Sequence, residues 1–248
     1  MKSLLAALQF LTIVPVKIKH IRENTVSYSL IFFPIIGLMI GGILTGAYLA
    51  LLYFGFQQLS ASIILVIFLI LITGGMHLDG LSDTADAFMS NKNKEEMLKI
   101  MRDSHAGVMG VLSIVSAILL KIALLISINI YLLPIALILT CLLSRWAMVF
   151  LIFLFPYARE EGKAKSFTKG INLKIFATAT LFALALSFLV WGFKGLLILI
   201  IISLFTYISG LLIKRKISGI TGDTIGAVNE ITEIAVLFCI CFLQRSLL

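Results

Sequence analysis

The feature that most constrains this chain is a series of long apolar runs. About 20 helical residues cross the hydrocarbon core of a bilayer, and six runs approach or exceed that length, at 31–54, 107–128, 132–155, 173–191, 195–213 and 225–243. A shorter run at 59–73 makes a seventh. The runs are continuous rather than alternating, which favours helices over a barrel.

Composition supports a membrane protein. The chain is 60% hydrophobic and 13% charged, whereas a soluble domain is about 25% charged. The sequence therefore predicts an all-α, polytopic integral membrane bundle of about seven transmembrane helices, forming a single domain over residues 1–248. The first stretch, 1–16, lacks a cleavage pattern and is expected to be a short interfacial or re-entrant helix. Three cysteines inside apolar runs indicate neither a disulfide framework nor a zinc site.

Basic residues indicate the orientation. Sixteen of the 20 lysines and arginines fall in four alternate polar segments, at 1–29, 76–106, 156–174 and 214–223. The positive-inside rule places these segments and the N-terminus in the cytoplasm, provided that 59–73 crosses the membrane. All twelve acidic residues lie in or next to the same segments, so any chemistry is expected on the cytoplasmic face. This distribution argues against nucleic acid as a partner.

The polar stretch GGMHLDGLSDTADAF, at 74–88, follows an apolar run directly. Asp79, Asp83 and Asp86 have i, i+4, i+7 spacing and would line one face of a helix. Carboxylates without thiolate or imidazole ligands suit a hard cation such as Mg²⁺, which often bridges to substrate phosphates. Gly74, Gly75 and Gly80 would let the backbone turn and approach a ligand closely. The alternative is a solvated helix whose acidic start complements its own dipole.

Two further polar segments have both structural and functional interpretations. In MRDSHAGVMG, at 101–110, Asp103 or Ser104 could cap the next helix, or Arg102 and His105 could neutralise phosphate and move a proton. In YAREEGKAKSF, at 157–167, Arg159 and Lys163 could bind phosphate or belong to a solvated loop.

Residues inside the apolar runs also need partners. Arg145 lies about ten residues into its run and requires a carboxylate or a ligand phosphate. In GITGDTIGAVNEITE, at 219–233, Gly222 and Asp223 could form a turn, whereas Asn229 and Glu230 are expected to face the bundle interior or a site. The glycines of GLMIGGILTG, at 37–46, have a four-residue spacing that indicates a close helix contact.

Taken together, these segments resemble the cobalamin synthase family, the cobalamin-5′-phosphate synthases or adenosylcobinamide-GDP ribazoletransferases. The matching stretches, which include FFPIIGLMIG at 32–41, occur in an order that covers nearly the whole chain. The resemblance implies a Mg²⁺-dependent activity of the cytoplasmic (inner) membrane. It joins adenosylcobinamide-GDP to α-ribazole or its 5′-phosphate and releases GMP. Many members carry arginine at the position of His105, which favours a charge-pairing role that either residue can fill.

This chemistry assigns roles to the polar residues. Phosphoryl-group displacement depends on positioning and charge neutralisation. The metal is assigned to Asp79, Asp83 and Asp86. The candidates for the general base are His77, Asp103 and His105, and Arg102 is assigned to neutralising charge on the phosphate. Substrate contacts are assigned to a third set of residues: Arg145, Arg159, Lys163, Gly222, Asp223, Asn229 and Glu230.

Two rivals stay open. Another membrane phosphotransferase or prenyltransferase could use aspartates with Mg²⁺, although the DGxxAR and DDxxD patterns of those classes are missing from the sequence. An ion-coupled transporter would place ionisable groups near the midplane, where this sequence has only Lys121 and Arg145 well inside runs. The lipid bilayer and the two substrates are the expected partners, with a homo-oligomer and other late cobalamin-synthesis enzymes as further candidates.

Overall fold

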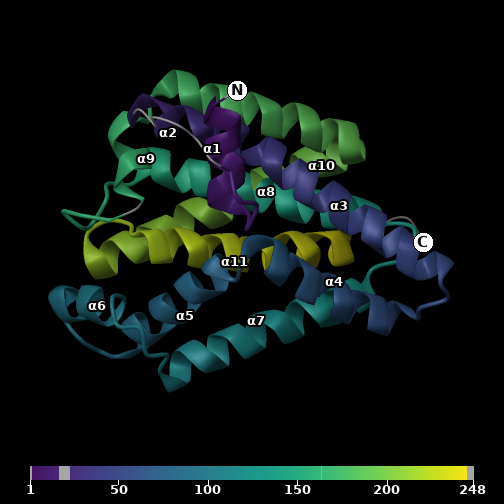
Figure 1. Ribbon diagram of the computed structural model, residues 1–248, viewed down its shortest axis with the longest axis horizontal. Helices are drawn as coiled ribbons and strands as arrows, with labels where there is room; N and C mark the ends of the chain where they lie inside the picture. The colour runs from purple at the N-terminus through teal and green to yellow at the C-terminus, as the bar shows by residue number, and fades with distance from the viewer. Residues whose placement is uncertain (1, 17–22, 163, 245–248) are drawn as a thin grey trace.

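The computed structural model describes residues 2–16, 23–162 and 164–244, and it is built of helices (Figure 1). The described elements are α1 (Lys2–Leu11), α2 (Glu23–Ser29), the 3-10 helix η1 (Leu30–Phe32), α3 (Phe33–Tyr53), α4 (Gln58–Thr73), α5 (Met76–Met89), α6 (Lys94–Ile100), α7 (Val108–Ser127), α8 (Leu133–Leu154), α9 (Lys165–Gly170), α10 (Leu173–Ile217) and α11 (Gly222–Leu243). The all-α prediction is confirmed.

Several of these helices can cross a membrane. Within the described residues, five helices are long and apolar enough, at Asn24–Tyr53, Val108–Ser127, Leu133–Leu154, Leu173–Ile217 and Gly222–Leu243. The pair α4 and α5 makes a sixth if the two are taken as one broken span, and they meet at an angle of 91°. A polytopic membrane bundle is therefore confirmed. The number seven stays a prediction, because it requires both halves of α10 and α4 alone to cross.

Helix α10 is two helices joined at a sharp break. Trp191 and Gly192 have non-helical backbone angles, and Gly192 has a φ of +56°. Just beyond the break, the Gly195 backbone lies so close to the Ser187 carbonyl that a Cβ atom would collide with it. Figure 1 accordingly shows the two halves of α10 as separate arms. The break matches the predicted boundary between the runs 173–191 and 195–213.

Helix α8 is the centre of the bundle. Most of its side chains are buried, and α3, α10 and α11 all pack against it. The backbones of α3 and α8 are in close contact, since a Cβ atom at Gly41 would lie 2.6 Å from the Ile138 Cα atom. Gly37 likewise touches the backbone at Cys141, whereas Gly42 and Gly46 have no neighbour within 4 Å of such an atom. The predicted glycine contact is confirmed for the first pair and wrong for the second, because Gly42 and Gly46 face away from α8.

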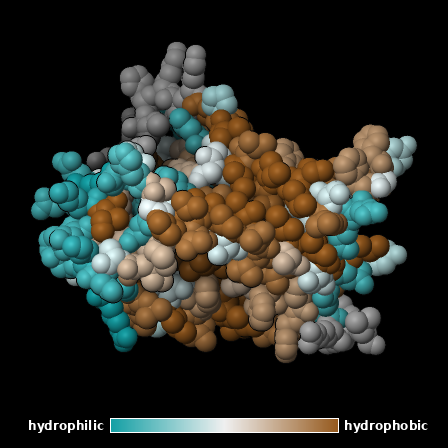
Figure 2. All heavy atoms as spheres, turned by 90° about the horizontal axis from the view of Figure 1, so that it is seen from below, coloured by the Kyte–Doolittle hydropathy of each residue, from teal (hydrophilic) through white to brown (hydrophobic). Residues whose placement is uncertain are grey.

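The outer surface is largely apolar. Figure 2 shows a broad hydrophobic face, with hydrophilic side chains concentrated toward the end of the molecule that carries α6. Large exposed side chains such as Leu189, Leu204 and Phe238 lie along the long helices. A water-soluble protein would have to cover an apolar surface of this extent. The face therefore fits a surrounding bilayer.

The polar segments gather at one end of the bundle. Helices α6 and α9 and the first turn of α11 lie near one another in Figure 1, and the α3–α4 connection lies at the opposite end. This grouping agrees with the distribution of basic residues, but which end faces the cytoplasm stays a prediction. Lys17, Lys19 and Arg22, which contribute to that prediction, fall outside the described residues.

The expected short N-terminal helix is present, at Lys2–Leu11, and its placement in the membrane interface stays a prediction. Helix α1 packs on α2 and α3, with Ala7 and Leu11 buried. The Ile13 amide then donates a hydrogen bond of 2.8 Å to the Ile72 carbonyl oxygen at the end of α4. All three cysteines are free thiols.

The α3–α8 contact is testable by substitution. Gly41→Leu forces a side chain into the α8 backbone and is expected to cost about 3 kcal/mol or more. Gly42→Leu adds the same side chain one residue away, at an exposed position, and serves as the matched control. The thermal unfolding midpoint in detergent should fall strongly for Gly41→Leu only. Equal midpoints for the two variants would contradict the described packing.

Candidate functional site

A cavity of about 620 Å³ opens at the polar end of the bundle. Four parts of the chain line it: the first two turns of α5, the loop 101–106, the segment that follows α8, and the start of α11. Met148 and Ile152 of α8 and Phe10 of α1 form its apolar floor. Its ionisable lining residues are His77, Asp79, Asp83, Arg102, Asp103, Arg159 and Asp223.

Two consecutive glycines turn the chain into the cavity. Gly74 ends α4 with a φ of +64°, and Gly75 begins α5 with a φ of +69°. Residues other than glycine rarely adopt such backbone angles. The two glycines therefore allow the bend of 91° between α4 and α5. The predicted turn is therefore confirmed at Gly74 and Gly75.

Close backbone contact fixes α5 against α11. A Cβ atom at Gly80 would lie 2.6 Å from the Asp223 carbonyl oxygen. One at Gly226 would lie 3.3 Å from the His77 backbone. Gly80 was expected to let the backbone approach a ligand, but the structure shows that it admits α11 instead. The contact places Asp223 beside the carboxylates of α5.

A short backbone bridge fixes the segment after α8. The Ala158 amide donates to the Ile220 carbonyl oxygen, and the Ile220 amide donates to the Pro156 carbonyl oxygen, each at 2.8 Å. Gly219 lies against the same segment, since a Cβ atom there would lie 2.5 Å from the Pro156 oxygen. Thr221 then caps α11 in a reciprocal capping box with Thr224. The bridge brings Arg159 next to the first turn of α11.

Arg159 and Asp223 form an ion pair across this bridge. Arg159 Nη2 lies 2.8 Å from Asp223 Oδ2, and both side chains are largely buried. Within the described residues, Nε of Arg159 has no hydrogen-bond partner. The guanidinium therefore retains donor capacity for an anion in the cavity.

Asp79 and Asp83 lie one helical turn apart on the cavity wall. Neither carboxylate forms a hydrogen bond or an ion pair with another residue of the described ranges. Two carboxylates without protein partners therefore lie in a cavity that also contains Asp223, Arg102 and Arg159.

His77 forms part of the buried wall between α5 and α11. Its side chain is 2% exposed, and both ring nitrogens lack a hydrogen-bond partner among the described residues. A buried imidazole without partners loses hydrogen-bond energy, and it can recover that energy from a ligand in the cavity.

Comparison with known proteins identifies the family. The family model for cobalamin-5-phosphate synthase matches residues 3–241. The chain belongs to this family. The adenosylcobinamide-GDP ribazoletransferase of Thermoanaerobacter sp. (strain X514) is 40% identical over 249 residues, which cover 99% of this chain and 98% of the relative.

Other relatives carry the same name. The adenosylcobinamide-GDP ribazoletransferase of Roseiflexus sp. (strain RS-1) is 41% identical over 93% of this chain and 86% of its own length. The one from Caldanaerobacter subterraneus subsp. tengcongensis is 38% identical over 100% of this chain and 99% of its own length. No solved structure matches the chain.

The cobalamin synthase motif at 74–88 does not form a row of three metal-facing aspartates. Asp86 accepts hydrogen bonds from the Gly107 amide at 2.7 Å and the Gly110 amide at 2.8 Å. It therefore caps the N-terminus of α7, the role that had been considered for Asp103 or Ser104. Both oxygens of Asp86 are engaged by α7, so Asp86 as a metal ligand stays a prediction that this contact does not support. In the described part of the chain, no three His, Cys, Asp or Glu residues are arranged to hold an ion.

The intramembrane residues of the family pattern form an interior network. Arg145 Nη1 donates to Glu233, and Lys121 Nζ donates to Glu233 and, at 2.6 Å, to Glu230 Oε2. Asn229 donates to Glu233 Oε1 at 3.2 Å. Arg145, Asn229 and Glu230 are buried in this network and do not line the cavity. The substrate contacts expected of them stay predictions that the described geometry does not support. Asn229 and Glu230 are buried in the bundle, one of the two alternatives that the sequence left open for them.

Some residues of the loop between α6 and α7 line the cavity and others do not. Arg102 and Asp103 line the cavity, whereas His105 is exposed and does not line it. His105 Nδ1 lies 2.7 Å from Asp103 Oδ1. This side-chain contact, with the His105 amide, lowers the pKa of Asp103. The charge-pairing role inferred for His105 is the one that its position supports.

The remaining predicted residues either line the cavity or fall outside the described residues. Gly222 and Asp223 line the cavity, as expected, and Lys163 falls outside the described residues. Sequence reasoning missed Tyr157, which lines the cavity beside Arg159 and whose pKa is raised by burial. The signal for Tyr157 was its place at the start of the polar segment 157–167.

The two roles of the aspartates predict different effects on stability. Asp86→Ala removes the cap of α7 and is expected to cost about 1–2 kcal/mol. Asp79→Ala removes a carboxylate that has no partner among the described residues, so its thermal unfolding midpoint should match that of the parent protein. Melting curves in detergent measure both variants. A similar loss of stability for the two would contradict the assignment of Asp86 to α7.

Proposed function

We propose that the protein joins adenosylcobinamide-GDP to α-ribazole or its 5′-phosphate and releases GMP, in the last assembly step of cobalamin. The observation that carries the proposal is the full-length similarity to enzymes of this name, combined with a cavity that holds acidic and basic groups from the family motifs. We place the cavity at the cytoplasmic face of the inner membrane, because the basic segments gather at this end.

The reaction is a displacement at phosphorus. A ribose hydroxyl oxygen forms a bond to the cobinamide-linked phosphorus, and the bond from that phosphorus to the GMP oxygen breaks. GMP leaves with the electron pair of that bond, and the hydroxyl proton passes to a base. Such transfers depend on alignment of the two oxygens and on neutralisation of charge on the phosphoryl oxygens.

Arg159 and Arg102 provide the positive charge in this scheme. Arg159 is anchored by Asp223 and has an Nε–H group without a hydrogen-bond partner among the residues described. Arg102 extends from the opposite loop into the same cavity. Because a guanidinium binds two phosphate oxygens at once, the pair would hold the pyrophosphate from two sides.

Asp79 and Asp83 would hold the magnesium ion, with Asp223 nearby. The donor set fits, since Mg²⁺ is commonly bound by one or two carboxylates together with substrate phosphates rather than by an all-protein cage. When bound, the ion supplies charge neutralisation on the pyrophosphate. Asp79 and Asp83 themselves orient the phosphate end of the substrate toward α5.

His77 is the favoured base among the three candidates. It lies in the cavity wall with both ring nitrogens available, whereas Asp103 is engaged by His105, which is exposed and does not line the cavity. Desolvation disfavours the charged form of a buried imidazole, and the neutral form is the one that accepts a proton.

The carboxylate assignment predicts loss of turnover without loss of the fold. Asp83→Asn keeps the shape of the side chain and removes the charge, so GMP release from adenosylcobinamide-GDP, α-ribazole and Mg²⁺ should fall at least about a hundredfold. Glu95→Gln, an exposed carboxylate on α6, is the matched control and should retain activity. Near-normal release by monodisperse Asp83→Asn at saturating Mg²⁺ would overturn the metal assignment.

The assignment of His77 is tested separately. His77→Gln keeps a hydrogen-bonding side chain but cannot accept the proton, so kcat should fall about 10²- to 10⁴-fold, with little change in KM. The thermal midpoint of the variant serves as the control for folding. If kcat is unchanged, or if KM alone rises, His77 positions substrate and another group is the base.

A further inference from the structure

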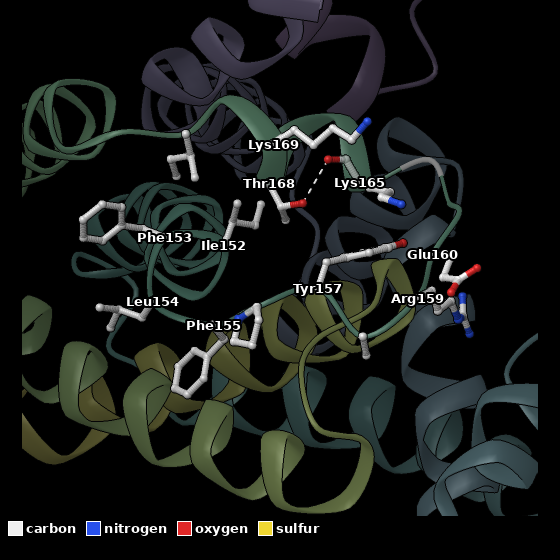
Figure 3. Close-up of a pocket in the computed structure, with 13 residues that line it drawn as sticks. Ile152, Phe153, Leu154, Phe155, Tyr157, Arg159, Glu160, Lys165, Thr168 and Lys169 are labelled. Carbon is white, nitrogen blue, oxygen red and sulfur yellow. Dashed lines mark hydrogen bonds between the residues drawn. The ribbon is translucent and has the colours of Figure 1, made fainter.

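A second cavity, of about 590 Å³, lies outside the acidic site. Its apolar wall is the end of α8 and the loop that follows, 152–156, and its polar wall is α9 (Figure 3). Ile152, Tyr157 and Arg159 line this cavity and the proposed active site alike. The two spaces are therefore neighbours that share one wall.

The second cavity lies at the boundary of the membrane. Helix α8, a candidate span, ends at Leu154, and the next candidate span begins at Leu173. Leu154, which lines the cavity, is 42% exposed, so an apolar side chain at this boundary is open to the surroundings. A ligand here would be in contact with hydrocarbon at one end and with polar groups at the other.

The polar wall carries surplus positive charge. Lys165 and Lys169 lie one turn apart on α9, and both line the cavity. Neither forms an ion pair with any residue in the described ranges. Glu160 is the acidic residue of the lining, and Arg159 is paired with Asp223. Figure 3 shows the two lysines on α9 and Phe153 and Leu154 on the side of α8, and all four residues line the cavity.

We propose that this cavity binds the headgroup of an anionic phospholipid. The phosphate would lie against Lys165 and Lys169, and an acyl chain would continue along Phe153, Leu154 and Leu173. Basic pockets beside transmembrane helices recognise anionic headgroups in this way. A free anion would gain nothing from the apolar wall, whereas a lipid would contact that wall with its acyl chain. The lining therefore favours a lipid over soluble phosphate. The inference does not depend on the proposed reaction.

Lipid at this position would also support the active site. The segment 155–160 forms one wall of each cavity and holds Tyr157 and Arg159. Its fixed contacts are the bridge to Ile220 and the ion pair with Asp223. A bound headgroup adds contacts on the face of the segment away from α11, which would stabilise the folded protein.

The test compares lipids and charge-matched variants. The parent protein is placed in nanodiscs of phosphatidylcholine alone and of phosphatidylcholine with phosphatidylglycerol in equal amounts, and the thermal unfolding midpoint is measured. Bound phosphatidylglycerol is followed by native mass spectrometry. K165Q/K169Q removes the two lysines of the cavity, and K94Q/K99Q removes two lysines of α6 as the matched control.

We expect phosphatidylglycerol to raise the midpoint of the parent and of K94Q/K99Q. In K165Q/K169Q most of this rise should be lost, and the affinity for phosphatidylglycerol should fall on the order of tenfold. K169Q alone, at an exposed position, provides a variant with little risk of misfolding and should show part of the loss.

Three results would overturn the proposal. The first is an equal rise of the midpoint in both double variants, which would indicate a general effect of membrane charge. The second is unchanged retention of phosphatidylglycerol by K165Q/K169Q and K169Q. The third is equal stabilisation of the detergent-solubilised protein by inorganic phosphate, which would indicate a site for a soluble anion.

Discussion

Charge pairing in the apolar interior holds together the helices that build the site. Lys121 of α7 and Arg145 of α8 meet Glu230 and Glu233 of α11, so two cations face two carboxylates. A charge left alone in such surroundings costs several kcal/mol, and this cost makes the pairing of the three helices obligatory. The position of α11 is thereby fixed with respect to α7 and α8.

Close backbone packing carries this constraint to the cavity. From α11, the contacts at Gly80 and Gly226 position α5, and the bridge between Ala158 and Ile220 positions the segment after α8. Asp86 of α5 then caps α7 through two backbone amides. Each of these contacts joins segments that are distant in sequence, so the carboxylates of α5 and the guanidinium of Arg159 meet only when all of them are formed.

Much of the site could be predicted from the sequence because its residues stand in short polar stretches beside apolar runs. His77, Asp79, Asp83, Arg102, Asp103, Arg159 and Asp223 were all candidates, and the structure brings them to one cavity. Helical spacing could not predict that Asp86 would meet the amides of α7, since periodicity gives the face of a helix but not the neighbour that this face meets. It also could not predict that Arg145 would find its partner in Glu233 rather than in a substrate.

The sequence by itself determined the class of protein, the helical architecture and the family. Apolar runs of this length and charges confined to a few segments leave few other arrangements in a bilayer. Only the tertiary structure decided which polar residues face the cavity and which face one another. The physical reason is that a buried charge or an uncapped helix end takes the nearest partner that geometry allows, and this partner lies on another helix.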